Sequence, residues 1–254
     1  MGISLIIGLL LSGAIGVSLG LIGGGGSIIT VPVLVYVLGV EAHQAVSMSL
    51  AVVGATSLVG TALHHRHGAV VWRIGALFGG SGILGAFFGS RLTYLFSPSA
   101  LLLIFAVLMM VIATFMLTRK SVSKDAPPSE LKTAKAVLAG LAVGGLTGFL
   151  GVGGGFLIVP ALVFFGGLSM KDAIGTSLLV IAINCFAGLS GHLNHGGFDV
   201  RLAALITGLA VSGTLIGTAL SHQVSAPKLQ KWFAMFVFVV AIFLLVKNYH
   251  ALVA

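Results

Sequence analysis

Two glycine runs, 128 residues apart, interrupt apolar segments and limit how this chain can fold. The first is Gly23-Gly24-Gly25-Gly26, followed by Ser27 and Pro32, and the second is Gly151-Val152-Gly153-Gly154-Gly155, followed by Phe156 and Pro160. Glycine inside a helix costs about 1 kcal/mol relative to alanine. Each run therefore predicts an unwound turn that leads into a new, short helix.

The composition places the chain in a lipid bilayer. Apolar residues make up 58% of the 254 residues and charged residues only 7%, whereas soluble domains have about 25% charged residues. The formal net charge is +8, but the basic residues lie between apolar runs, where the positive-inside rule places them. The sequence predicts an all-α polytopic membrane protein with no nucleic-acid partner. Its single cysteine, Cys185, has no partner for an internal disulfide.

Ten apolar runs divide the chain into two halves of five segments. They span residues 3–22, 27–39, 42–63, 71–96 and 99–118, then 134–150, 155–166, 170–191, 198–220 and 228–248. The second run of each half is only about 17–20 Å long as a helix, too short for a hydrocarbon core of about 30 Å. We expect these two to be re-entrant or half-length helices. We predict one transmembrane repeat over 1–118, a polar linker over 119–133 and a second repeat over 134–254.

The same 128-residue offset extends well beyond the glycines. Ser49 matches Ser177, His64 matches His192 and Arg73 matches Arg201, within about twenty identities over about 70 residues, which indicates an internal duplication. An odd number of segments inverts the second repeat in the membrane. Ten of the thirteen lysines and arginines then fall on the linker side, so we predict a cytoplasmic linker and both termini outside. Inverted repeats are typical of secondary transporters, which bind substrate at the repeat interface.

The glycine runs predict an anion site made of backbone groups. Ser27 is expected to cap a half-helix beginning at Ile28, and the first turn of such a helix has free N–H groups that carry partial positive charge. Two facing helix amino termini bind an anion without an intramembrane lysine or arginine. Pro32 and Pro160, inside the half-helices, are expected to free the carbonyls four residues earlier. The predicted binding residues are Gly24, Gly25, Gly26, Ser27, Gly153, Gly154, Gly155 and Phe156. The alternative role of glycine, close helix packing, is expected for the scattered glycines from Gly75 to Gly89.

Several motifs resemble the signature pattern of the TauE/SafE family of sulfite exporters. They are the two glycine runs with Pro32 and Pro160, the hexapeptide Ala173-Ile174-Gly175-Thr176-Ser177-Leu178, and His192 with Gly196. The resemblance covers nearly the whole chain. It implies a carrier in a bacterial or archaeal inner membrane for small sulfur-containing anions such as sulfite, sulfoacetate or other organosulfonates. The first half departs from the pattern at Ser47-Met48-Ser49, where the second has Gly175-Thr176-Ser177.

Polar side chains on the third segment of each half are further candidates for substrate binding. Ser49, Thr176, Ser177 and Asn184 lie near the proposed breaks and carry hydrogen-bond donors suited to sulfonate oxygens. The last three fall near one helical face. The alternative is that these groups bond to neighbouring helices or to the preceding turn.

The histidines follow the third segments in pairs, His64 with His67 and His192 with His195. Their i, i+3 spacing suits a metal site, but inversion would put the pairs on opposite faces, so no metal and no cofactor is predicted. We expect these histidines to close helix carboxyl termini, with Gly68 and Gly196 in left-handed turns. A gating or proton-linked role for His64 and His192 is the alternative, because histidine titrates near neutral pH.

Taken together, the sequence predicts a secondary transporter that moves a small anion by alternating access. No acidic residue occupies a segment centre, so no carboxylate relay is visible and the energy source stays open. A passive anion channel is an alternative. A second alternative is an intramembrane serine protease, because Ser81 and Ser190 lie between glycines. The two serines do not correspond in the repeat, so an enzyme is not predicted.

Overall fold

The computed structural model describes residues 3–92, 98–118, 133–150, 155–192 and 199–248. These residues form ten α-helices and one π-helical segment, η1, and they include no strand. In the first half the elements are α1 (Ile3–Ile22), α2 (Gly25–Pro32), η1 (Val33–Val37), α3 (Ala42–Arg66), α4 (Trp72–Leu92) and α5 (Pro98–Thr118). In the second half they are α6 (Thr133–Leu150), α7 (Gly155–Phe164), α8 (Met170–His192), α9 (Val200–Gln223) and α10 (Ala226–Asn248).

The helices confirm the predicted all-α polytopic membrane fold. Helices α1, α3, α8, α9 and α10 each contain an apolar stretch of 19 to 24 residues, long enough to cross a bilayer. By contrast, α2 with η1 and α7 are too short to span a hydrocarbon core of about 30 Å. Large apolar side chains such as Leu10 and Val246 face outward, as lipid-facing helices require.

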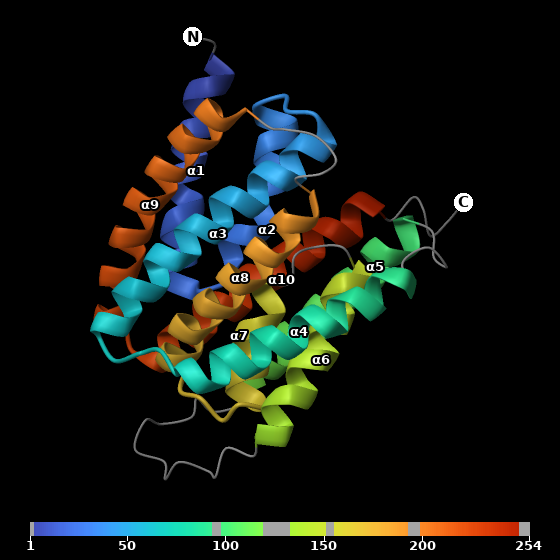
Figure 1. Ribbon diagram of the computed structural model, residues 1–254, viewed down its shortest axis with the longest axis vertical. Coiled ribbons are helices and arrows are strands. Elements are labelled where there is room, and N and C mark those ends of the chain that lie inside the picture. Colours follow the sequence, from blue (N-terminus) through green and yellow to red (C-terminus); the bar gives the residue numbers. More distant parts are fainter. Residues whose placement is uncertain (1–2, 93–97, 119–132, 151–154, 193–198, 249–254) are drawn as a thin grey trace.

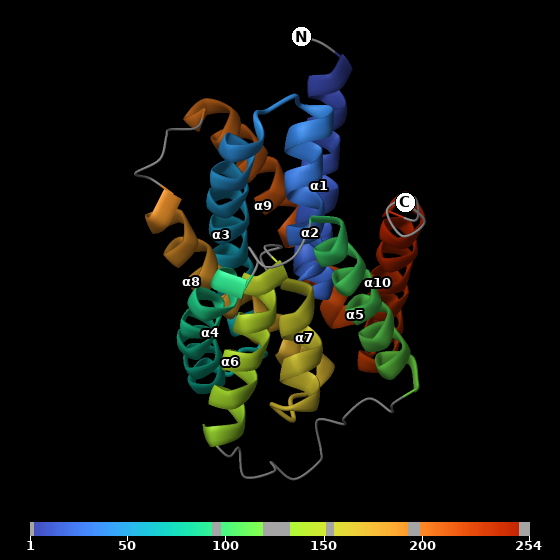
Figure 2. The same cartoon turned by 90° about the vertical axis from the view of Figure 1, so that its right-hand side faces the viewer.

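The two halves of the chain have matching helices. Helix α3 starts at residue 42 and α8 at 170, α4 at 72 and α9 at 200, and α5 at 98 and α10 at 226, so each pair keeps the 128-residue offset. The packed helix pairs also correspond between the halves. Helix α1 packs along α9, and their counterparts α6 and α4 pack along each other. Helix α3 packs against its own counterpart α8, and α5 against its counterpart α10. Helices α2 and α7 start near the middle of the molecule and run toward opposite ends (Figures 1 and 2).

Glycines allow the most extensive helix pairs to approach closely. A Cβ at Gly16 of α1 would overlap the Ala210 carbonyl of α9, and one at Gly213 would overlap the Gly13 carbonyl. The Thr214 hydroxyl donates to the Gly16 carbonyl across this interface at 3.0 Å. In the α4–α6 pair, Cβ atoms at Gly85 and Gly89 would overlap backbone carbonyls of α6 in the same way. These contacts confirm the packing role predicted for those two scattered glycines.

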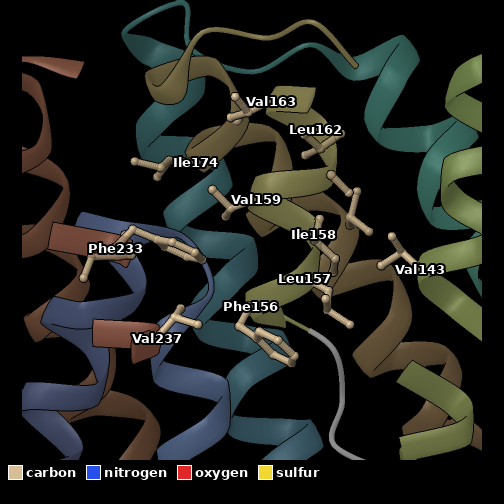
Figure 3. Close-up of a cluster of buried hydrophobic side chains, with 14 of the residues drawn as sticks. Val143, Phe156, Leu157, Ile158, Val159, Leu162, Val163, Ile174, Phe233 and Val237 are labelled. Carbon is tan, nitrogen blue, oxygen red and sulfur yellow. The ribbon is translucent and has the colours of Figure 1, made fainter. Parts of the chain in front are cut away.

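The second half-helix lies in the middle of the main core. Every residue of α7 from Gly155 to Val163 is buried. Val143 of α6, Ile174 of α8, and Phe233 and Val237 of α10 surround it (Figure 3). The first half-helix is more peripheral, because Pro32 is exposed whereas its counterpart Pro160 is buried. The two half-helices therefore have unequal surroundings.

The α1–α9 contact predicts a steric effect that depends on position. Gly16→Ala should lower stability by about 1–3 kcal/mol, because the new methyl group has no space against the Ala210 carbonyl. Gly208→Ala is the matched control: Gly208 also lies in a helix of this pair, but a Cβ there has no atom within 4 Å in the described chain. Thermal unfolding of both variants in detergent checks the prediction, and equal midpoints would contradict it.

Candidate functional site

The two helix breaks meet in the middle of the fold. Gly23 has φ of +80°, a left-handed conformation that favours glycine, and α2 begins two residues later. A Cβ at Gly24 would overlap the Gly155 carbonyl oxygen, and a Cβ at Gly155 would overlap the Ser27 hydroxyl. Gly24, Gly25, Gly26, Gly155 and Phe156 are all buried. The breaks therefore approach as predicted; the predicted site residues Gly153 and Gly154 lie outside the described residues.

The start of α2 differs from the prediction. The helix begins at Gly25 rather than Ile28, with Gly24 as its N-cap, and Ser27 lies inside the first turn. Its hydroxyl donates to the Gly24 carbonyl at 2.9 Å instead of capping the helix. The reason is packing: a Cβ at Gly26 would be only 2.6 Å from the Ile15 carbonyl of α1, so only glycine allows this turn to pack so closely. Ser27 remains at the junction, but as part of the helix.

Both prolines lie inside short helices, as predicted. Pro32 is the last residue of α2, and the chain continues as the π-helix η1, in which the Leu38 amide donates to the Val33 carbonyl at 3.1 Å. Because proline has no N–H, it interrupts the regular i to i+4 pattern at this point. Pro160 lies within α7, in the core.

Three consecutive residues of α8 join the first break to the turn between α3 and α4. Gly175 leaves no space for a Cβ, which would lie 2.9 Å from the His64 Cβ. The Thr176 hydroxyl accepts the Val71 amide at 3.0 Å. The Ser177 hydroxyl donates to the Gly23 carbonyl at 3.1 Å and to the Ile174 carbonyl at 2.7 Å. Each residue of this tripeptide thus contacts a different part of the first half of the chain.

The polar candidates consequently separate into two groups. Ser177 lies at the first break, beside Gly23. Thr176 bonds to the residue before α4, and the Asn184 carboxamide lies 3.9 Å from where a Cβ of Gly82 in α4 would be. The buried Asn184 Oδ1 has no hydrogen-bond partner within the described residues. Ser49 is buried in α3.

Histidine side chains gather where α3, α1 and α9 meet. His64 is 1% exposed, and its Nε2 lies 3.0 Å from the Gly20 carbonyl oxygen of α1. The exposed His67 stacks on His222 of α9 with ring centroids 3.9 Å apart, and His64 lies 5.1 Å from His222. Gly68 has φ of +65° and the Ala69 amide donates to the His64 carbonyl, which confirms the predicted helix closure there. His192 ends α8, but its side chain lies outside the described part.

Sequence reasoning missed His222 and Gly20 as partners of His64. They are 158 and 44 residues away in the chain, and residue 94, the counterpart of His222 in the repeat, is a tyrosine. Neither the duplication nor helical spacing carries a signal for this contact.

Comparison with known proteins agrees with this architecture. The family model for the sulfite exporter TauE/SafE matches residues 8–244. The chain belongs to the sulfite exporter TauE/SafE family. Three relatives are each named a probable membrane transporter protein. One from Xylella fastidiosa (strain 9a5c) is 36% identical, covering 99% of this chain and 98% of the relative. YdhB of Bacillus subtilis (strain 168) is 31% identical, covering 82% and 86%. MJ0441 of Methanocaldococcus jannaschii is 24% identical, covering 91% of each chain.

The Thr176 contact predicts a cost of losing one hydroxyl. Thr176→Val keeps the shape of the side chain but removes the acceptor for the Val71 amide, so stability should fall by about 1–3 kcal/mol. Thr176→Ser retains a hydroxyl and should restore most of the loss. Thermal unfolding of the two variants beside the unaltered protein measures the difference. A valine variant as stable as the serine variant would contradict a role for this hydrogen bond.

Proposed function

We propose that this TauE/SafE family member is a secondary transporter of a small sulfur-containing anion, such as sulfite, sulfoacetate or another organosulfonate. The observation that carries the proposal is the contact between the two helix breaks, at Gly24 and Gly155. We place the anion between Gly24–Ser27 and Gly153–Phe156, held mainly by backbone N–H groups. The names of the relatives support a transporter.

The chemistry of the junction supports an anion rather than a cation. The first turn of a helix leaves N–H groups without intrahelical partners, with about half a positive charge at the terminus. The acids in the described chain, Glu41, Asp172 and Asp199, lie at helix ends. No acid of the described helices therefore lies in the first turn of α2 or α7, where it would repel an anion. Ser177 adds a hydroxyl beside Gly23.

Matching halves of the chain support transport by alternating access. The 128-residue offset in helix starts and the exchange of packed pairs are what two inverted repeats would give. We propose that one repeat rocks against the other around the contact of the breaks. In an inner membrane, both termini would lie on the side away from the cytoplasm, and the 119–133 linker would lie in the cytoplasm. In this orientation ten of the thirteen lysines and arginines face the cytoplasm.

A first test measures ligand-dependent stability. Any compound that binds only the folded protein raises the midpoint of unfolding by mass action. We expect one sulfur oxyanion or sulfonate to stabilise the detergent-solubilised protein selectively, in a panel of sulfite, sulfate, sulfoacetate, taurine, small carboxylates and simple cations. Stabilisation only by cations, or by no compound in the panel, would contradict the proposed substrate class.

A second test blocks the site. Gly25→Val should abolish transport in liposomes while leaving an inserted protein, because a Cβ at Gly25 would lie 2.7 Å from the Ser18 hydroxyl and 2.9 Å from the Phe236 ring. Gly154→Val, at the second break, is likewise expected to abolish transport while leaving an inserted protein. Gly80→Val is the control, because a Cβ at Gly80 has no atom within 4 Å in the described chain. Near-normal flux in both break variants would rule out this site.

A further inference from the structure

We infer that His64 binds a proton that accompanies the anion, so that transport is coupled to protons. This inference rests on the proposed function and adds the coupling ion to it. Three features of the His64 side chain support it. One imidazole nitrogen is available for protonation, the ring lies at the carboxyl end of α1, and other histidine rings connect His64 to the surface.

The first feature is the hydrogen bonding of the buried ring. A carbonyl oxygen only accepts hydrogen bonds, so Nε2 of His64 carries the hydrogen that points at Gly20, 3.0 Å away. In the neutral ring, Nδ1 therefore has a lone pair. Nδ1 is buried and has no hydrogen-bond partner within the described residues. A proton can thus be added at Nδ1 without breaking the bond to Gly20.

The second feature is the position of His64 beside the break. Gly20 belongs to the last turn of α1, which ends at Ile22, and the carboxyl end of a helix carries about half a negative charge. A protonated imidazole is favoured at that end. Helix α2 starts at Gly25, and its amino end has the opposite sign. One break in the chain therefore presents a cation site on one side and an anion site on the other.

The third feature is a route from the surface to His64. His67 is exposed, His222 is partly buried, and their stacked rings lead to His64, which is 1% exposed. Charged groups nearby are mostly positive: Arg66 follows His64 on α3, and the Lys171 amine of α8 donates to the His222 carbonyl at 3.0 Å. Asp172, also on α8, is hydrogen-bonded to Ser169. These positive neighbours disfavour a positively charged imidazole at His64. A bound anion nearby would offset their effect and so favour protonation of His64.

The polar surroundings of His64 on α3 differ from the residues at the matching positions of α8. Polar side chains lie on the same face of α3 as His64, in the turns that precede it. Helix α9 packs against α3 and also carries polar side chains. All are buried: Ser57, Thr61 and His64 on α3, and Thr214, Thr218 and Ser221 on α9. In the second repeat the counterparts of Ser57 and Thr61 are Cys185 and Leu189. The α3 part of this polar row is thus not repeated in α8, and we assign the proton site to the His64 side.

The test measures protons and anions together. Sulfoacetate is the probe, because its carboxylate and sulfonate stay ionised between pH 5.5 and 8. Calorimetric titrations of the full chain in detergent, in two buffers with different ionisation enthalpies, count the protons taken up per anion. In the upper part of this range the unaltered protein should take up close to one proton per anion. Its affinity should fall as the pH rises, by at most tenfold per pH unit.

Two glutamine variants assign the proton to a residue. His64→Gln keeps a donor for the Gly20 carbonyl but has no titrating group, so anion affinity should become independent of pH and proton uptake should disappear. His65→Gln is the matched control, because His65 is the adjacent residue but is exposed, and both effects should persist. Retained proton uptake in His64→Gln would overturn the inference.

The remaining outcomes separate the inference from the proposed function. Sulfoacetate binding without proton uptake by the unaltered protein overturns proton coupling and leaves the anion carrier standing. Absence of binding by every anion in the stability panel overturns the proposed function, and the inference with it. If His64→Gln does not fold, the two-buffer measurement on the unaltered protein still tests proton coupling, and absence of proton uptake there overturns the inference.

Discussion

The central constraint on this fold is that a broken helix inside a membrane protein must find partners for its peptide groups. An unsatisfied backbone group in hydrocarbon costs several kcal/mol, so irregular backbone survives only where protein or a cavity surrounds it. Here the first break is enclosed by α1, α7 and α8: Gly26 contacts α1, Gly24 contacts Gly155, and Ser177 donates to the Gly23 carbonyl. The glycines at the break make this enclosure possible, because the close backbone approach leaves no space for a side chain.

The sequence predicts the helical segments well, because the bilayer imposes a strong apolar signal. Predicted runs such as 3–22 and 99–118 coincide with α1 and α5, and Gly68 adopts the expected left-handed turn. Details that depend on contacts between distant residues were not predictable. Ser27 does not cap α2, since packing of Gly26 on α1 starts the helix earlier. The contacts of His64 with Gly20 and His222 are not indicated by helical spacing or by the 128-residue correspondence between the halves.

The two halves of the chain have corresponding helices but different local chemistry. Gly175-Thr176-Ser177 in α8 makes three separate contacts with the first half of the chain, which has Ser47-Met48-Ser49 at the matching positions. Pro32 is exposed and Pro160 buried, although both end up in short helices. Equivalent positions have therefore taken on unequal structural roles. Such asymmetry is compatible with a shared scaffold, because helix starts at 42 and 170, or 98 and 226, still correspond.

The burial of α7 also bears on the order in which the protein assembles. Long apolar helices such as α1 and α9 can enter a bilayer independently, and helices already in the membrane then associate. Helix α7 has ten residues and cannot span the membrane alone, and its residues from Gly155 to Val163 are covered by neighbouring helices. Its final position must therefore come from helix association rather than from insertion. A substitution that disturbs the packing of α6, α8 or α10 would then displace α7 and the second break, even where the substituted residue lies far from that break.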